Sequence, residues 1–92
     1  MATPYRSSPV FDETTLPAAL RREHRTKAGV WGVIRVIEGT LKLVVADEET
    51  MLTPERPGLV LPEQTHRVEP QGSMRMQVDF YDEMPTPPAA SA

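Results

Sequence analysis

Short apolar runs separated by turn residues are the feature that most limits how this chain can fold. The runs are rich in β-branched and aliphatic residues and lie at 30–38, 41–46, 51–52, 59–61 and 66–69. Between the first two runs, Gly39 supplies the residue that a tight hairpin turn favours. Strands this short, with turns about every 8 to 12 residues, predict a small all-β sandwich or barrel.

A further segment, residues 74–81, alternates apolar and polar side chains, which indicates a strand with one buried face. The predicted inner residues are Met74, Met76, Val78 and Phe80, and the predicted outer residues are Arg75, Gln77, Asp79 and Tyr81. Only residues 16–25 have the composition of a helix, and their length allows about two turns.

The length of 92 residues fits a single domain. We expect an N-terminal arm or edge strand at 1–12, one domain at 13–84 and a disordered tail rich in proline and alanine at 85–92. A chain of this size has a small core, and it contains no cysteine for disulfides. We therefore expect a homodimer.

Charge and hydropathy limit the partners and the location. The 10 basic and 13 acidic residues give a net charge of −3, and the one basic cluster, at 21–27, is short and interrupted, so a nucleic-acid partner is not expected. No apolar run reaches the roughly 18 residues that a membrane-spanning helix needs, and the N-terminus lacks the apolar region of a signal peptide. The expected location is the cytoplasm.

His24 and His66 are the only two histidines, and each lies beside a turn next to an apolar run. Neutral imidazole is the commonest protein metal ligand and also titrates near neutral pH. If the fold brings these side chains together, they mark the place where chemistry or binding occurs. Alternatively, either imidazole serves only as a hydrogen-bonded structural residue.

Three stretches carry a resemblance to a known family. The segments HRTKAGVWGVIRVIEGTLKL, PERPGLVLPEQTHRVEP and MQVDFYDE resemble the TehB/YeaR-like family of small cupins, and the resemblance covers roughly residues 15–83. It implies a double-stranded β-helix, the conserved β-barrel of cupins, with two facing antiparallel sheets. It also implies that a ligand binds in the mouth of the barrel.

The resemblance implies less about function. Members occur alone or as the N-terminal part of longer proteins tied to tellurite resistance, whose second part is a methyltransferase that uses S-adenosylmethionine. We expect the stand-alone form here, because the chain has no Gly-rich loop of the kind that holds an adenosyl cofactor. For stand-alone members the resemblance points to tellurite, other oxyanion or nitrogen-oxide stress.

Compared with metal-binding cupins, the chain keeps only part of the ligand pattern. It lacks the His-x-His pair and the glutamate of the first motif, whereas Gly58, Pro62 and His66 match the second. We expect His24 and His66 to bind a divalent metal, with Asp79 as the first choice for a third ligand and Glu63 as the second. Zinc, iron, manganese, nickel and copper all suit these ligands. Asp79 is alternatively a salt-bridge partner of an arginine.

The other candidate ligand-binding residues are Lys27, Trp31, Arg35, Glu63 and Tyr81. Trp31 either packs in the core or forms a wall of the ligand cavity. Arg35 either faces solvent or, together with Lys27, holds an anion at the barrel mouth.

Three functions follow from these residues. The first is a metal-binding cupin that holds a small anionic or oxygen-rich ligand, with hydrolytic or redox chemistry left open. The second is a metal-free module that binds a ligand without catalysis. The third is an interaction domain related to a module normally fused to an enzyme.

Overall fold

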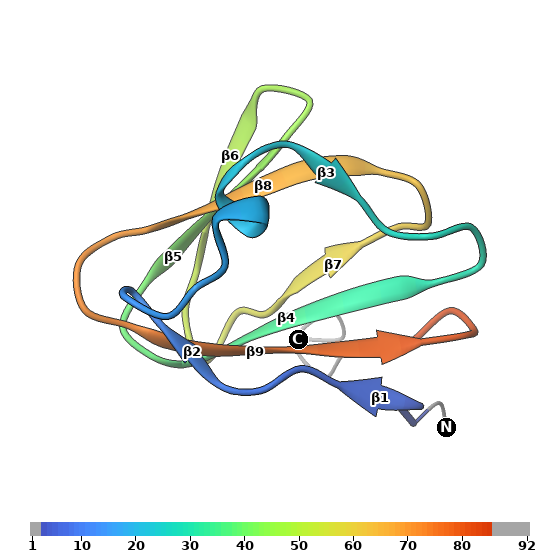
Figure 1. The fold of residues 1–92 in the computed structure, drawn as a ribbon, viewed down its shortest axis with the longest axis horizontal. Coiled ribbons are helices and arrows are strands. Elements are labelled where there is room, and N and C mark those ends of the chain that lie inside the picture. The colour runs from blue at the N-terminus through green and yellow to red at the C-terminus, as the bar shows by residue number, and fades with distance from the viewer. Residues whose placement is uncertain (1–2, 86–92) are drawn as a thin grey trace.

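The computed structural model describes residues 3–85, which form two antiparallel β-sheets packed face to face (Figure 1). One sheet has the order β1 (Arg6–Ser7), β9 (Arg75–Tyr81), β4 (Trp31–Glu38) and β7 (Gly58–Val60), and β2 (Phe11–Asp12) also pairs with β9. The second sheet has the order β3 (His24–Arg25), β8 (Thr65–Pro70), β5 (Leu41–Val45) and β6 (Glu48–Leu52). The all-β prediction with two facing sheets is confirmed. The two sheets stay separate and do not close into a barrel.

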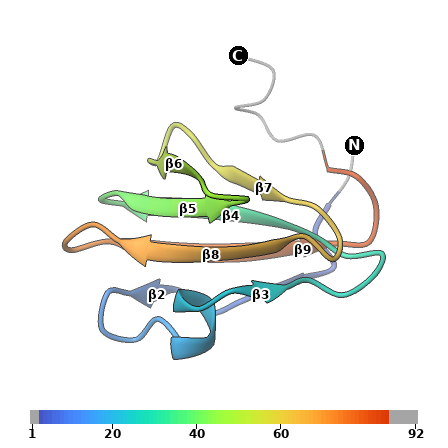
Figure 2. The same cartoon turned by 90° about the horizontal axis from the view of Figure 1, so that it is seen from above.

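Figure 2 shows how the two layers are aligned, with β5 over β4 and β8 over β9. The connections from β4 to β5 and from β8 to β9 cross between the sheets at one end of the molecule. The loops at 26–30 and 61–64 lie at the other end, together with the end of β9 (Figure 1). Loops from both sheets therefore surround a single end of the sandwich.

The core lies between the layers and consists of aliphatic side chains from both sheets. Its buried members are Leu16, Ile34, Val36, Leu41, Leu43, Leu52, Val60, Val68, Met74 and Met76. The predicted alternation of the last strand agrees with this core, because Met76 is fully buried while its neighbour Arg75 is exposed. Burying such side chains is the main force that holds the two sheets together.

Gly39 forms the turn after β4, as predicted, and its backbone adopts a conformation that favours glycine. Gly39 has φ +81°, in the left-handed region. A Cβ at this position would lie 2.9 Å from Cα of Met74, so the turn also needs the absence of a side chain. Gly39 thus allows the β4–β5 connection to pass directly beside the start of β9.

Two local predictions need correction. The runs expected at 41–46 and 51–52 leave residues 47–50 for a turn, but the turn is tighter, because Ala46 and Asp47 both adopt positive φ values, 50° and 66°, and β6 already begins at Glu48. The helix expected within 16–25 is reduced to a 3-10 helix, η1 (Ala18–Arg21), followed by β3. Pairing of β3 with β8 prevails over local helix propensity. Within residues 3–85, no helix is long and apolar enough to cross a bilayer.

The N-terminal arm predicted at 1–12 contributes two short strands, since β1 and β2 both pair with β9. Most of the tail predicted at 85–92 lies outside the described residues.

Candidate functional site

A cavity of about 290 Å³ lies between the sheets. Its inner wall is the core itself, because Ile34, Val60, Val68 and Met76 line the cavity and are at most 3% exposed. Phe11, Val78 and Phe80 extend the apolar wall. A hollow bounded by both sheets and apolar inside has the character of a small-molecule site.

The two histidines meet in this cavity. His24 on β3 and His66 on β8 are direct cross-strand partners, and their ring centroids lie 4.0 Å apart at an interplanar angle of 54°. Both side chains line the cavity. The fold therefore brings together the pair that the sequence singled out.

The backbone determines which ring nitrogen each histidine offers to a ligand. Nδ1 of His66 lies 2.9 Å from the carbonyl oxygen of Gln64, and Nδ1 of His24 lies 3.2 Å from that of Arg22. A carbonyl oxygen only accepts, so in each neutral ring Nδ1 carries the hydrogen and donates it. Each Nε2 is then left with a lone pair, and it becomes a donor when the ring is protonated.

Burial changes the titration of one member of the pair. The pKa of His66 is lowered, mainly because burial disfavours the imidazolium, and the neighbouring His24 lowers it further. The hydrogen bond to the Gln64 carbonyl opposes this shift. His66 is therefore neutral at neutral pH in the free protein.

This lowered pKa predicts a loss of stability in mild acid. Unfolded His66 takes up a proton near pH 6.5, whereas the folded side chain resists protonation, so the free energy of unfolding falls as the pH drops below about 6.5. Urea unfolding at pH 7.5 and pH 5.5 measures this loss. In His66→Gln we expect a smaller difference between the two pH values, and equal differences in both proteins would contradict the assignment.

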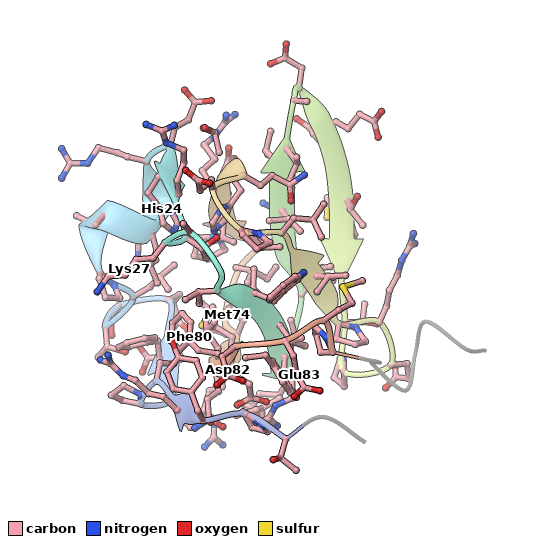
Figure 3. The ribbon with its side chains drawn as sticks, turned by 90° about the vertical axis from the view of Figure 1, so that its right-hand side faces the viewer. His24, Lys27, Met74, Phe80, Asp82 and Glu83 are labelled. Carbon is pink, nitrogen blue, oxygen red and sulfur yellow. The ribbon has the colours of Figure 1, made fainter. Side chains whose placement is uncertain are left out.

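Positive charge lines the cavity. Arg6, Arg25 and Lys27 are among its lining residues and are exposed, and we refer to them as the rim residues. The guanidinium of Arg6 lies 5.9 Å from the ring centroid of Phe80. Of the described residues that line the cavity, none is acidic. Figure 3 faces this end of the molecule, with His24 and Lys27 on the side of β3 and Phe80 on the side of β9.

Asp79 lies on the opposite face of its strand, away from the histidines. Its carboxylate accepts a hydrogen bond from Nε of Arg35 at 2.6 Å and from the hydroxyl of Ser7 at 2.7 Å. The carboxylate in turn raises the pKa of Arg35. Of the two roles open to Asp79, metal ligand or salt-bridge partner, the structure shows the ion pair with Arg35, on the outer face of the first sheet.

The other predicted ligand-binding residues divide between the cavity and the surface. Lys27 lines the cavity. Trp31 and Tyr81 are cross-strand partners at the ends of β4 and β9, both are half-buried, and neither lines the cavity. Glu63 is exposed with φ 61°, and its backbone N–H donates to the carbonyl of Thr26, which joins the two loops at this end.

Comparison with known proteins identifies the family. The family model described as TehB-like domain matches residues 6–78. The chain belongs to the TehB-like family. The matched range includes both histidines, the rim residues and nearly every described strand.

Relatives of this TehB-like chain are longer proteins. It is 36% identical over 72 residues to "Probable S-adenosyl-L-methionine-dependent methyltransferase TehB" of Haemophilus influenzae (strain Rd), a match that covers 71% of this chain and 25% of the relative. The protein of the same name from strain 10810 is 35% identical over the same length. The chain thus spans about a quarter of these relatives.

Two solved structures share the fold. The crystal structure of TehB from H. influenzae superimposes with a TM-score of 0.80 at 31% identity, covering 86% of this chain and 30% of that one. A crystal structure of a protein from Escherichia coli K12 superimposes with a TM-score of 0.81 at 22% identity, covering 92% and 93% of the two chains. The second match extends over nearly the whole of both proteins and supports the fold.

The predicted divalent metal, whether zinc, iron, manganese, nickel or copper, is wrong. Within residues 3–85, no group of three or more histidine, cysteine or carboxylate side chains is placed to hold a metal ion. Asp79 cannot complete the pair because strand alternation directs it to the outer face, where Arg35 and Ser7 hold it. The names of the TehB relatives specify S-adenosyl-L-methionine rather than a metal.

Several residues of the TehB-like cavity were not predicted from the sequence. Arg6 and Phe11 come from the N-terminal arm, and Arg25 belongs to the short basic cluster at 21–27. Their short strands carry little periodic signal because each is two residues long. The one signal in the sequence was the absence of acidic residues between Arg25 and Glu38, beside the first histidine.

Proposed function

We propose that this TehB-like chain is a metal-free ligand-binding domain that holds a small anionic ligand in the cavity between its sheets. The observation that carries the proposal is the lining of the cavity, which includes an imidazole pair and three cationic residues and, among the described lining residues, no acidic one. Such a field attracts negative charge and repels positive charge. A role of this binding in oxyanion or nitrogen-oxide stress, and the expected homodimer, stay predictions.

The chemistry of the lining also bears on the cofactor of the longer relatives. S-adenosyl-L-methionine carries a positively charged sulfonium, which the cationic rim disfavours. The segment matched in those relatives is about a quarter of their length. We therefore do not propose methyl transfer by this chain.

Acid is expected to strengthen anion binding. A bound anion favours the imidazolium, whose Nε2–H donates to it, and the charged residues that line the cavity with the histidines are the cationic Arg6, Arg25 and Lys27. Because the pKa of His66 is lowered in the free protein, binding of an anion takes up a proton, and the affinity rises as the pH falls.

Calorimetric titration with acetate, nitrate and tellurite at pH 8.0 and pH 5.5 tests the proposal. We expect at least one of these anions to bind, with an affinity about tenfold higher at pH 5.5. His66→Gln should lose most of the pH dependence. Absence of binding by every anion, or preferential binding of S-adenosyl-L-methionine, would refute the proposal.

A further inference from the structure

We propose that the ligand is an amphipathic organic acid, in which one carboxylate is joined to an apolar body of the size of a short alkyl chain or a single ring. This inference rests on the proposed function and specifies its ligand class. It follows from the apolar lining of the inner cavity. An anion held by the charge at the rim would not need such a lining.

The polar and apolar groups of the cavity are segregated by depth. The exposed cationic residues Arg6, Arg25 and Lys27 lie at the rim, whereas Ile34, Val60, Val68 and Met76 form the inner wall and are nearly inaccessible. An inorganic oxyanion is polar on every side, so it has no favourable contact with that inner wall. A carboxylate with an apolar tail has one end suited to each region.

Two hydroxyl side chains of the lining, those of Thr26 and Ser8, are already occupied within the protein. The hydroxyl of Thr26 donates to the carbonyl of Leu61, at 2.9 Å. Ser8 donates its hydroxyl hydrogen to the carbonyl of Pro9, and its oxygen accepts the N–H of Val78. These bonds leave the two Nε2 atoms, the hydroxyl of the exposed Tyr5 and the rim cations as the polar groups available to a ligand, and all of them lie apart from the buried aliphatic wall.

The volume agrees with a ligand of this kind. A cavity of about 150 Å³ in an apolar core already accepts benzene. The volume of about 290 Å³ found here leaves room for an apolar body together with its carboxylate.

Gly32 enlarges the cavity on the side of the first sheet. It lies on β4 and lines the cavity, and a Cβ built on it would lie 3.8 Å from Val78 and 3.9 Å from both Thr26 and Val60, at ordinary contact distance. No close contact therefore demands a glycine here. Its effect is to leave open the space that a side chain would otherwise fill.

A series of straight-chain carboxylates tests the apolar part directly. With wild-type protein at pH 5.5, calorimetric affinities for acetate, butanoate and hexanoate should rise about fourfold for each added methylene, because each buried methylene contributes about 0.8 kcal/mol. Hexanamide, the neutral counterpart, should bind at least about tenfold more weakly than hexanoate. Nitrate and tellurite should bind no more tightly than acetate.

Gly32→Leu fills apolar space of the cavity between Val78 and Val60 and provides the matched variant. We expect it to reduce hexanoate affinity to the level of acetate, while acetate affinity changes by less than about threefold. Ile37→Leu, an exposed position on the same strand, should leave the whole series unchanged. Urea unfolding of both variants establishes whether they fold. If Gly32→Leu does not fold, the carboxylate series with wild-type protein alone tests the apolar part of the ligand.

The outcomes separate this inference from the proposed function. Flat affinities along the carboxylate series, or nitrate and tellurite binding as tightly as hexanoate, would overturn the organic acid while anion binding stands. Equal binding of hexanamide and hexanoate would overturn the anionic ligand. No binding by any carboxylate would refute the inference, and no binding by any anion would refute both proposals.

Discussion

Replacing Gly39 by alanine is expected to lower the free energy of unfolding by about 3 kcal/mol, a large loss for the addition of a single methyl group. Two costs add up. A non-glycine residue in the left-handed region costs about 1–2 kcal/mol, and forcing atoms into a packed site costs about 1–3 kcal/mol more. The added Cβ would lie 2.9 Å from both Cα and Cβ of Met74 and would collide with the Ser73 carbonyl. Backbone atoms cannot move aside as the end of a flexible side chain can.

Gly72→Ala is the matched control for this prediction. Gly72 has φ +87°, close to that of Gly39, but nothing lies within 4 Å of the position where its Cβ would be. It should therefore show only the conformational cost, about 1–2 kcal/mol. Urea unfolding of both variants at pH 7.5 measures the difference. Equal losses would mean that the crowding at Met74 is relieved at no cost.

The second large effect is expected at the ion pair on the outer face of the first sheet. Arg35→Leu should destabilise the protein by about 2 kcal/mol, because it removes a charged hydrogen-bond donor from a buried carboxylate. Asp79 is only 6% exposed, and Ser7 alone would remain to donate to it from a side chain. Hydration cannot readily replace the guanidinium at that depth.

Arg75→Leu removes an arginine of the same sheet from a solvent-exposed pair. Arg75 and its partner Glu38 have side chains that are 56% and 60% exposed, so this change should alter the unfolding free energy by no more than about 0.5 kcal/mol. Chemical unfolding of the two variants at pH 7.5 compares them. A loss for Arg75→Leu as large as that for Arg35→Leu would show that burial of Asp79 does not decide the energy.

The strands that form the site were largely predictable because their side chains alternate or are β-branched. β4, β5, β8 and β9 all lie within two residues of the ranges expected from the sequence. Strand alternation also predicted that Asp79 and Met76 face opposite ways, which the structure confirms. The same alternation directs Asp79 away from the face that His66 lines. Asp79 therefore cannot act as the third metal ligand, and the predicted metal site was wrong for this reason.

The cavity was less predictable than the strands. His24 could be recognised as a candidate, but its partner depends on the register of β3 against β8, which pairs it directly with His66. Arg6 reaches the rim only because β1 pairs with the far end of β9. A two-residue strand has too few side chains to show a period, so its place comes from long-range pairing alone.

The sequence by itself determined the class of fold, the position of the Gly39 turn and the choice of the two histidines as candidate site residues. Each of these depends on local periodicity, backbone freedom or residue type. Only the tertiary structure decided that the imidazoles lie 4.0 Å apart, that cations gather at one rim and that the apolar interior is hollow. The physical reason is that these properties depend on strand register and on how two sheets pack. Neither is encoded in any single stretch of the chain.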